Sequence, residues 1–224
     1  MNITERIKLF KSDLRQETLN YEAIIQKHLI DAPTYYFENY IKIPSAENSL
    51  KSLIAQSFSI NKEEVFIIGS GKTGFSFKPN NLFKEFDYKY SLSKLIKDKS
   101  DLDIVIISSK LYELIGRNMY NYTAAYNDKW KNNEYYSFEK ARQFPVPICY
   151  KCFEYYTKGW FRPDFKPYGF EFCEKGSFEE LKRNIYKIIG RKGTIAVYQN
   201  WFYFSNYHIT NIKNLSLKLK TEKV

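Results

Sequence analysis

The chain contains few of the residues that build covalent or metal-centred frameworks. Its 224 residues include three cysteines and two histidines. An odd number of cysteines argues against a disulfide framework. The pair Cys149 and Cys152 has a spacing used in zinc sites, with Cys173 and His208 as remote partners. A structural zinc needs a closed set of four ligands, so we expect the cysteines to be buried as small apolar residues.

Long apolar runs are also missing. No stretch approaches the ~20 apolar residues that span a bilayer, and residues 1–6 lack the apolar centre of a secretory signal. We therefore expect a cytoplasmic protein without a membrane partner. Hydrophobic residues make up 44% of the chain and aromatic residues 18%, which is enough for one large domain or two small ones.

Acidic residues are in the minority. The chain has 25 of them against 35 lysines and arginines, a formal net charge of +10. Basic surfaces attract phosphate backbones, so this charge favours a nucleic-acid partner. The chain is also rich in Lys, Asn, Ile and Tyr together, as expected for an A+T-biased genome. The charge alone therefore leaves nucleic-acid binding and codon bias equally open.

Two aspartates stand at the start of an apolar run. Asp101 and Asp103 come just before residues 104–107, which read as a buried strand. Residues i and i+2 of a strand point to the same face, so the two carboxylates can aim at one place. Carboxylate oxygens are ligands that Mg²⁺ prefers, with substrate phosphates at other positions. The spacing therefore predicts a metal site at Asp101 and Asp103.

A Gly-Ser pair ends an earlier apolar run. Residues 65–68 predict a strand, and Gly69 and Ser70 follow it directly. Gly69 permits a tight turn, and Ser70 offers a hydroxyl and an N–H to a phosphate. Together with the aspartate pair, this turn predicts a metal-dependent phosphate site.

The joint pattern resembles the DNA polymerase β-like nucleotidyltransferase superfamily. Its hallmark is Gly-Ser at the end of one strand and Asp-x-Asp on the next, here preceded by Ser100. The resemblance covers about residues 50–125. Gly69 and Asp101 lie 32 positions apart, farther than in compact members, so residues 75–99 form an insertion. Residues 71–76 are also similar to bacterial members of uncertain substrate, some of which belong to defence or toxin–antitoxin loci.

The resemblance implies transfer of a nucleotidyl group from an NTP to a hydroxyl or phosphate acceptor. It implies that Asp101 and Asp103 hold one or two Mg²⁺ ions, which activate the acceptor oxygen and neutralise phosphate charge. It also implies that Gly69 and Ser70 seat the β- and γ-phosphates, with Lys72 adding positive charge. The acceptor stays open between a tRNA, a second nucleotide, a protein side chain and a small molecule.

A third carboxylate is the missing element of this pattern. Active members usually place one on a later strand, but the predicted strand 194–198 contains no acid. Asp164, in a turn rich in Arg and Trp, is the first candidate for this catalytic role. Glu171, in a short alternating segment, is the second. The uncertainty supports an alternative: a catalytically vestigial module that binds a protein or nucleic-acid partner.

Two further interpretations compete with a nucleotidyltransferase. Gly71, Lys72 and Thr73 end like a P-loop, but the position that requires the first glycine is Phe66. The loop would then lack half of its phosphate-binding glycines, which disfavours a P-loop NTPase. The simplest interpretation is a strand, turn and strand whose aspartates are solvated turn residues.

The insertion at residues 75–99 is basic and aromatic. Its five lysines after residue 80 are interleaved with phenylalanine and tyrosine. Aromatic residues among lysines can stack bases and contact phosphates. We favour a surface loop or short helix that packs its aromatic side chains on the sheet.

Periodicity and capping residues predict an α+β fold: a small mixed sheet with a nucleotidyltransferase-like core, N-terminal helices before it and a mainly helical C-terminal part. Strands are predicted at 65–68, 104–107 and 194–198. An N-terminal helix begins at Ile3 and is closed by Pro33, and further helices cover 46–58, 110–122, 130–144, 146–157, 178–189 and 201–219. We expect a core domain at 1–125 and a second part at 126–224 that forms one side of a cleft.

Overall fold

The protein, described here by a computed structural model, has a mixed α+β fold. The structure describes residues 1–224 except 17, 19, 131–133, 136–145 and 222–224. In this described part, strands β1 (Val65–Ile68), β2 (Leu102–Ile107), β6 (Gly193–Tyr198) and β5 (Trp160–Phe161) form one open sheet in the order β1-β2-β6-β5. β2 and β6 are parallel, and β1 and β5 pair antiparallel at the two edges. The three predicted strands are confirmed, whereas β5 was not predicted.

Alternation along the strands divides the interior into two apolar clusters. In β2, Leu102, Ile104 and Ile106 belong to one cluster, while Val105 and Ile107 belong to the other. Successive side chains of a strand point to opposite faces. Asp103 therefore shares the face of Val105 and Ile107, which decides on which side of the sheet its carboxylate lies.

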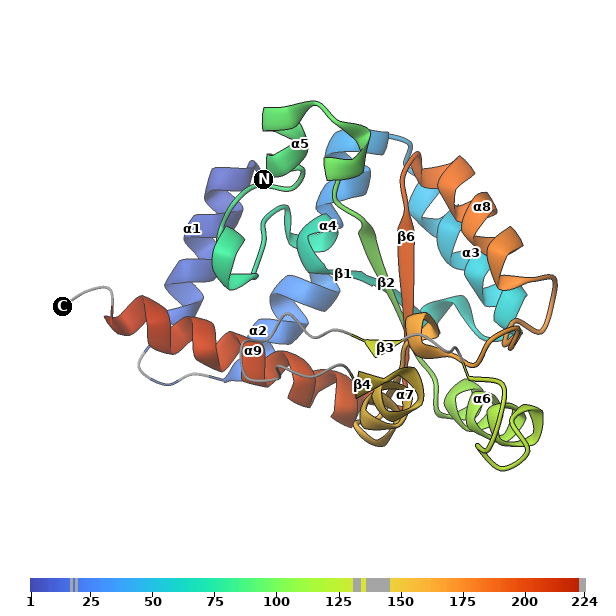
Figure 1. Cartoon of the computed structure of the whole chain (residues 1–224). Coiled ribbons are helices and arrows are strands. Elements are labelled where there is room, and N and C mark those ends of the chain that lie inside the picture. Colours follow the sequence, from blue (N-terminus) through green and yellow to red (C-terminus); the bar gives the residue numbers. More distant parts are fainter. Residues whose placement is uncertain (17, 19, 131–133, 136–145, 222–224) are drawn as a thin grey trace.

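Helices α3 (Ala46–Phe58), α8 (Phe178–Ile189) and α6 (Ser109–Tyr122) pack on the first face (Figure 1). The predicted bounds of α8 are confirmed. The Ser177 side chain accepts a hydrogen bond from the Glu180 N–H, and Gly190 ends the helix at φ +65°. Both signals are local in the sequence, because a cap satisfies the free backbone groups of its own helix.

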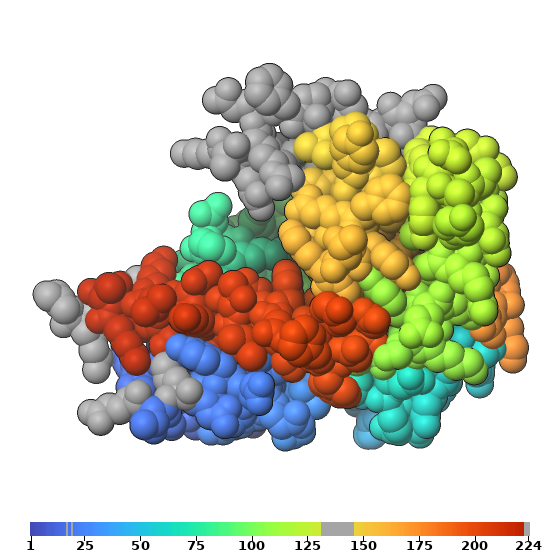
Figure 2. Space-filling model, turned by 90° about the horizontal axis from the view of Figure 1, so that it is seen from below, coloured from blue at the N-terminus to red at the C-terminus, as the bar shows by residue number. Residues whose placement is uncertain are grey.

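The second face is covered mainly by segments from both ends of the chain: α1 (Ile3–Leu14), α2 (Tyr21–Ile25), the π-helical η1 (Gln26–Asp31) and α9 (Trp201–Thr221). The short α4 (Gly69–Thr73) follows β1 and contacts β1, β2 and η1. Figure 2 shows α9 lying along the N-terminal segments. The Ser216 hydroxyl donates to the Leu14 carbonyl at 2.9 Å, which ties the two ends together. The face that carries Asp103 is therefore built from the two ends of the chain.

The continuous N-terminal helix that we predicted is wrong. α1 ends at Leu14, and Asn20 begins α2 by accepting a hydrogen bond from the Ala23 N–H at 3.0 Å. Asparagine at an N-cap satisfies a free backbone donor, so the apolar stripe continues through two helices. The segment before Ser45 also contains a π-helical turn, η2 (Phe37–Ile41).

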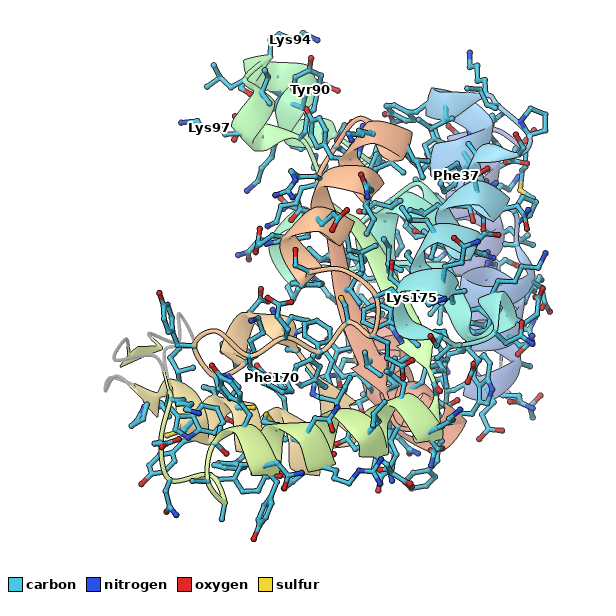
Figure 3. All side chains as sticks on the ribbon, turned by 90° about the vertical axis from the view of Figure 1, so that its right-hand side faces the viewer. Phe37, Tyr90, Lys94, Lys97, Phe170 and Lys175 are labelled. Carbon is cyan, nitrogen blue, oxygen red and sulfur yellow. The ribbon has the colours of Figure 1, made fainter. Side chains whose placement is uncertain are left out.

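The insertion contains short helices, as predicted. They are η4 (Pro79–Asn81), α5 (Tyr88–Ser93) and η5 (Ile96–Asp98). Phe75 and Phe86 are buried, so part of its aromatic content packs in the core. α5 projects from the body of the molecule, with Tyr90, Lys94 and Lys97 on it or beside it (Figure 3).

The C-terminal part contributes strands as well as helices. Helix α7 (Ile148–Thr157) matches its prediction. The helix predicted over 130–144 lies largely outside the described residues, but Glu134–Tyr135 form strand β3, paired with β4 (Val146–Pro147). The predicted boundary at residues 125/126 falls between β2 and β6, which pair in one sheet. None of the described helices is long and apolar enough to cross a membrane.

Candidate functional site

Gly69 meets Asp103 at the end of β1. The antiparallel register pairs Ile68 with Asp103, so the chain turns directly beside the Asp103 carboxylate. Gly69 has φ +66°, and a Cβ on it would lie 2.5 Å from Asp103 Oδ2. Residues other than glycine rarely adopt this backbone conformation, and a Cβ atom essentially never lies this close to another heavy atom. The glycine of the Gly-Ser pair is thus required by the aspartate it faces.

Asp103 is held from the other side by Thr194. The two residues are register partners in the parallel pair β2 and β6, and Thr194 Oγ1 donates to Asp103 Oδ1 at 2.9 Å. Burial raises the pKa of the Asp103 carboxyl, although the Thr194 hydrogen bond and the Lys78 charge oppose the shift. An ionised Asp103 therefore favours any further cation that reaches it.

Asp101 lies one residue before β2, and Lys192 lies one residue before β6. Because these strands run parallel, the two side chains meet, with Lys192 Nζ 3.1 Å from Asp101 Oδ2. The side chains are 37% exposed for Asp101 and 69% exposed for Lys192. Exposed ion pairs contribute about 0–1 kcal/mol, so a charged ligand can displace this lysine.

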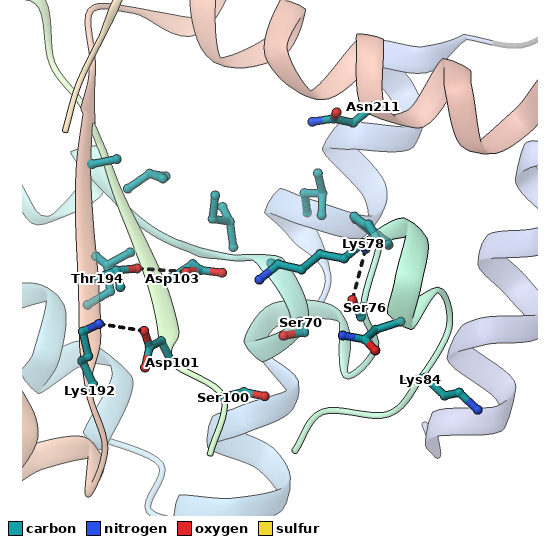
Figure 4. A pocket seen from close by; sticks show the side chains of 18 of the residues that line it. Ser70, Ser76, Lys78, Lys84, Ser100, Asp101, Asp103, Lys192, Thr194 and Asn211 are labelled. Atoms are coloured by element: carbon teal, nitrogen blue, oxygen red, sulfur yellow. Dashed lines mark hydrogen bonds and ion pairs between the residues drawn. The ribbon is translucent and has the colours of Figure 1, made fainter. Parts of the chain in front are cut away.

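Both aspartates line one cleft of about 1190 Å³. Ser70, Ser76, Lys78 and Ser100 also line it (Figure 4). Lys78 extends across the cleft from the 75–99 segment toward Asp103, and Asn211 points into it from α9 (Figure 4). Helix α9 thus supplies one wall of the cleft.

A buried ion pair braces the segment in front of Asp101. Arg191 donates to both carboxylate oxygens of Asp87 at 3.0 Å and to the Ser100 carbonyl at 2.9 Å. The Ser100 N–H donates in turn to Asp87 Oδ1 at 2.8 Å. The Arg191 guanidinium lies 4.4 Å from the centre of the Tyr36 ring and 4.7 Å from that of Phe86. The brace joins the insertion to the start of β6 and holds Asp101 at the cleft.

Lys72 does not reach the cleft. Its side chain is buried, and Nζ donates to the Ile30 carbonyl at 2.8 Å. Burial lowers the pKa of this ammonium group to about 8. Residues two apart on a helix point in opposite directions, so Lys72 turns away when Ser70 faces the cleft. Lys78, unlike Lys72, lines the cleft and extends across it.

The P-loop interpretation is not supported by the same segment. Gly71, Lys72 and Thr73 are buried, and a Cβ on Gly71 would lie 2.4 Å from Leu102 Cδ1. The Thr73 hydroxyl donates to the Phe75 carbonyl at 2.8 Å. Residues that serve the core in this way are not open to a phosphate.

The two candidates for a third carboxylate differ in position. Asp164 lines the cleft from η6 (Pro163–Phe165), where its side chain is 70% exposed and pairs with Arg162 at 2.8 Å. Glu171 instead accepts a hydrogen bond from the Phe178 N–H at 2.9 Å, at the first residue of α8. The alternating segment around Glu171 does not form a strand. The structure therefore brings Asp164 to the cleft and gives Glu171 a capping role.

Metal-ligand groups are sparse. Within the described residues, no three His, Cys, Asp or Glu side chains are grouped closely enough to hold a metal ion. On β6, the register position opposite Asp103 is Thr194. Asp101 and Asp103 therefore supply a donor set of two carboxylates.

Four residues of this site were missed by sequence reasoning: Lys78, Asp87, Arg191 and Thr194. The partners of Asp87, Arg191 and Thr194 lie far along the chain, with 104 positions between Asp87 and Arg191 and 91 between Asp103 and Thr194. No periodicity or motif marks such pairs. The one available signal was Thr194 itself, a polar residue in an otherwise apolar predicted strand.

Comparison with known proteins returned no matching family model, no matching curated protein and no matching solved structure. The function must therefore be argued from the cleft itself.

Proposed function

We propose that the protein is a nucleotidyltransferase that moves a nucleotidyl group from an NTP to an acceptor. The observation that carries this proposal is the contact between Gly69 and the Asp103 carboxylate, in the same cleft as Asp101 and Ser70. Gly69 lets the chain turn directly against the Asp103 carboxylate, and Ser70 then lines the same cleft as the two carboxylates. The resemblance stated from the sequence assigns the same residues to this chemistry.

The donor set fits Mg²⁺ that arrives with a nucleotide. Mg²⁺ is usually held by one or two carboxylates, with water and substrate phosphates completing its six positions. Asp101 and Asp103 match that requirement, with no third acid grouped with them among the described residues. When bound, Mg²⁺ would supply charge neutralisation at the phosphates. Asp101 would exchange its contact with Lys192 for this ion.

The remaining polar groups of the cleft suit a triphosphate. The Ser70 hydroxyl can donate to a phosphate oxygen, and Lys78 can place its ammonium group beside one. The acceptor hydroxyl oxygen would form a bond to the α-phosphorus. The bond from that phosphorus to the bridging oxygen would break, pyrophosphate would leave with the electron pair, and the hydroxyl proton would pass to water.

One observation favours the alternative, a module that binds nucleotide without transferring it. Thr194 occupies the strand position facing Asp103, where a third carboxylate would complete a two-metal site. Asp164, the candidate from the sequence that lines the cleft, is paired with Arg162 at 2.8 Å. The two candidate functions share the nucleotide site and differ only in catalysis.

Calorimetry with each NTP, with and without Mg²⁺, tests the shared site. We expect Mg²⁺-dependent binding by the wild type and its loss in Asp101→Asn and in Asp103→Asn. Asp128→Asn, an exposed acid outside the cleft, is the matched control and should bind normally. Equal, weak binding by all four proteins would refute the site.

Transfer is tested separately from binding. NTPs labelled at the α-phosphate are incubated with the protein and a cell extract, and the label is followed into larger molecules. Labelling that Asp103→Asn abolishes supports the enzyme. Mg²⁺-dependent NTP binding without labelling in any extract supports the binding module. Asp164→Asn then asks whether this acid takes part.

A further inference from the structure

The cleft is larger than one nucleotide requires. Its volume of about 1190 Å³ exceeds the ~300–1,000 Å³ typical of small-molecule sites. The proposed reaction also needs a second substrate, whose hydroxyl must reach the nucleotide. The space beyond Ser70 and the two aspartates can therefore hold the acceptor, and its chemistry can be read from the walls.

Positive charge dominates those walls. Among the described residues that line the cleft there are nine lysines and arginines against five aspartates and glutamates. Five of the nine, Lys78, Lys84, Lys89, Lys97 and Lys99, come from the insertion. Lys84, Lys89 and Lys97 are exposed and form no ion pair with any residue that the structure describes. Their charge is thus available to an anionic ligand.

Aromatic rings accompany these lysines. Tyr88 and Tyr90 of α5 are partly exposed, and Tyr88 lines the cleft. Lys84 Nζ lies 4.7 Å from the centre of the Tyr88 ring, and Lys99 Nζ lies 5.1 Å from that of Tyr90. Alternating lysines and aromatic rings follow the backbone and stack the bases of single-stranded nucleic acids.

We propose that the acceptor is the end of a single-stranded nucleic acid. Its phosphates would lie along Lys84, Lys89 and Lys97, and its terminal hydroxyl would enter the cleft toward Asp101 and Asp103. The identity of this substrate rests on the proposed nucleotidyltransferase function, whereas binding of the strand can be measured without it.

A membrane is the competing anionic surface. The tip of the insertion exposes Leu92 at 70%, Leu95 at 50% and Ile96 at 77%, and lysines beside aliphatic side chains can contact anionic lipid. However, Lys84, Lys89 and Lys97 line the cleft, as Ile96 does, whereas Leu92 and Leu95 do not. A flat bilayer cannot follow them there, and a flexible strand can. The geometry therefore favours the nucleic acid.

The test uses the full chain and a short fluorescein-labelled RNA strand of mixed sequence, followed by anisotropy in EDTA without nucleotide. Lys89→Glu/Lys97→Glu reverses two charges in the cleft. Lys175→Glu/Lys187→Glu reverses two exposed charges outside it and is the matched control. Unfolding curves check that both variants fold, and calorimetry with NTP and Mg²⁺ checks the nucleotide site separately.

We expect at least tenfold weaker RNA binding for the cleft variant, little change for the control, and unchanged NTP binding for both. The logarithm of the wild-type affinity should fall with the logarithm of salt between about 50 and about 200 mM, by ~0.7 for each lysine–phosphate contact. The cleft variant should show a shallower slope. A circular strand of the same sequence should bind more weakly than the linear one, because it has no end to insert.

Three results would overturn the proposal: no RNA binding by the wild type, equal loss in both double variants, or equal binding of circular and linear strands. Vesicles of phosphatidylcholine with and without phosphatidylserine form the membrane arm. Serine-lipid-dependent binding that the cleft variant loses, without RNA binding, would assign the lysines to a membrane instead. If the wild type bound RNA but not NTP with Mg²⁺, the proposed nucleotide site would be refuted and the RNA surface would remain.

Discussion

The Asp103 carboxylate leaves no room for a side chain at Gly69. A Cβ at this position would lie 2.5 Å from Oδ2, and the backbone already adopts φ +66°. The turn after β1 and the acid on β2 are therefore one structural unit. Any change at either residue should affect both the fold and the cleft.

Gly69→Ala should destabilise the protein by about 2–4 kcal/mol, of which ~1–2 kcal/mol is the cost of an L-residue at positive φ. Gly190→Ala is the matched control, since Gly190 has φ +65° and a Cβ there would meet nothing within 4 Å. Urea unfolding should show the larger loss at Gly69, and Gly69→Ala should also weaken NTP binding. Equal losses would mean that Asp103 does not restrict Gly69.

Asp103→Asn should stabilise the protein at neutral pH. Because burial raises the Asp103 pKa above its usual value near 3.8, the folded state holds this proton more tightly than the unfolded state. The associated stability is full below the unfolded pKa and is lost as the pH rises through the folded pKa. The asparagine can still accept the Thr194 hydrogen bond.

Thermal unfolding of wild type and Asp103→Asn between pH 4 and 7 measures this effect. The difference in unfolding temperature between Asp103→Asn and the wild type should grow in favour of the variant as the pH rises. The same variant should show no Mg²⁺-dependent NTP binding. Thr194→Val, which removes the hydrogen bond to an ionised Asp103, should be less stable than the wild type at pH 7. If Asp103→Asn were less stable than the wild type at pH 7, burial of the ionised Asp103 carboxylate would not be costing the wild type stability.

Lys72→Met should leave NTP binding unchanged, and Lys78→Met should weaken it several-fold. The reason is placement, since Lys72 Nζ donates to Ile30 and Lys78 extends across the cleft. The Lys72 pKa of about 8, against an unfolded value of 10.5, gives stability that is present above the unfolded pKa and is lost as the pH falls through the folded pKa.

Wild-type stability should therefore gain from Lys72 as the pH rises from about 8 toward 10.5, and Lys72→Met should lack that gain. Urea unfolding at several pH values in this range makes the comparison. If Lys72→Met abolished NTP binding while the protein stayed folded, Lys72 would have the phosphate-binding role that the resemblance implies.

Arg191→Met should cost about 3–5 kcal/mol, because it leaves the buried Asp87 carboxylate without its partner. Arg191→Met/Asp87→Asn should recover part of that loss, since the unpaired charge is gone. A double-mutant cycle by urea unfolding gives the coupling. Additive losses would mean that the two side chains act independently.

The sequence by itself determined the elements whose causes are local. The strands at β1, β2 and β6 follow from short apolar runs, and the bounds of α8 follow from Ser177 and Gly190. The pairing of Gly-Ser with Asp-x-Asp also located the residues that meet at the cleft. A cap or an alternation acts within a few residues, so it can be recognised without knowing the fold.

Only the tertiary structure decided the rest. It placed Thr194 against Asp103, directed Lys72 toward Ile30, brought Lys78 across the cleft and closed Arg191 on Asp87. It also added β5, whose two residues are too short for a periodic signal. These contacts join residues tens of positions apart, and their partners are chosen by strand register and by the side of a helix that packing turns inward. Neither is encoded in any local pattern, because both follow from how the whole chain buries its apolar faces.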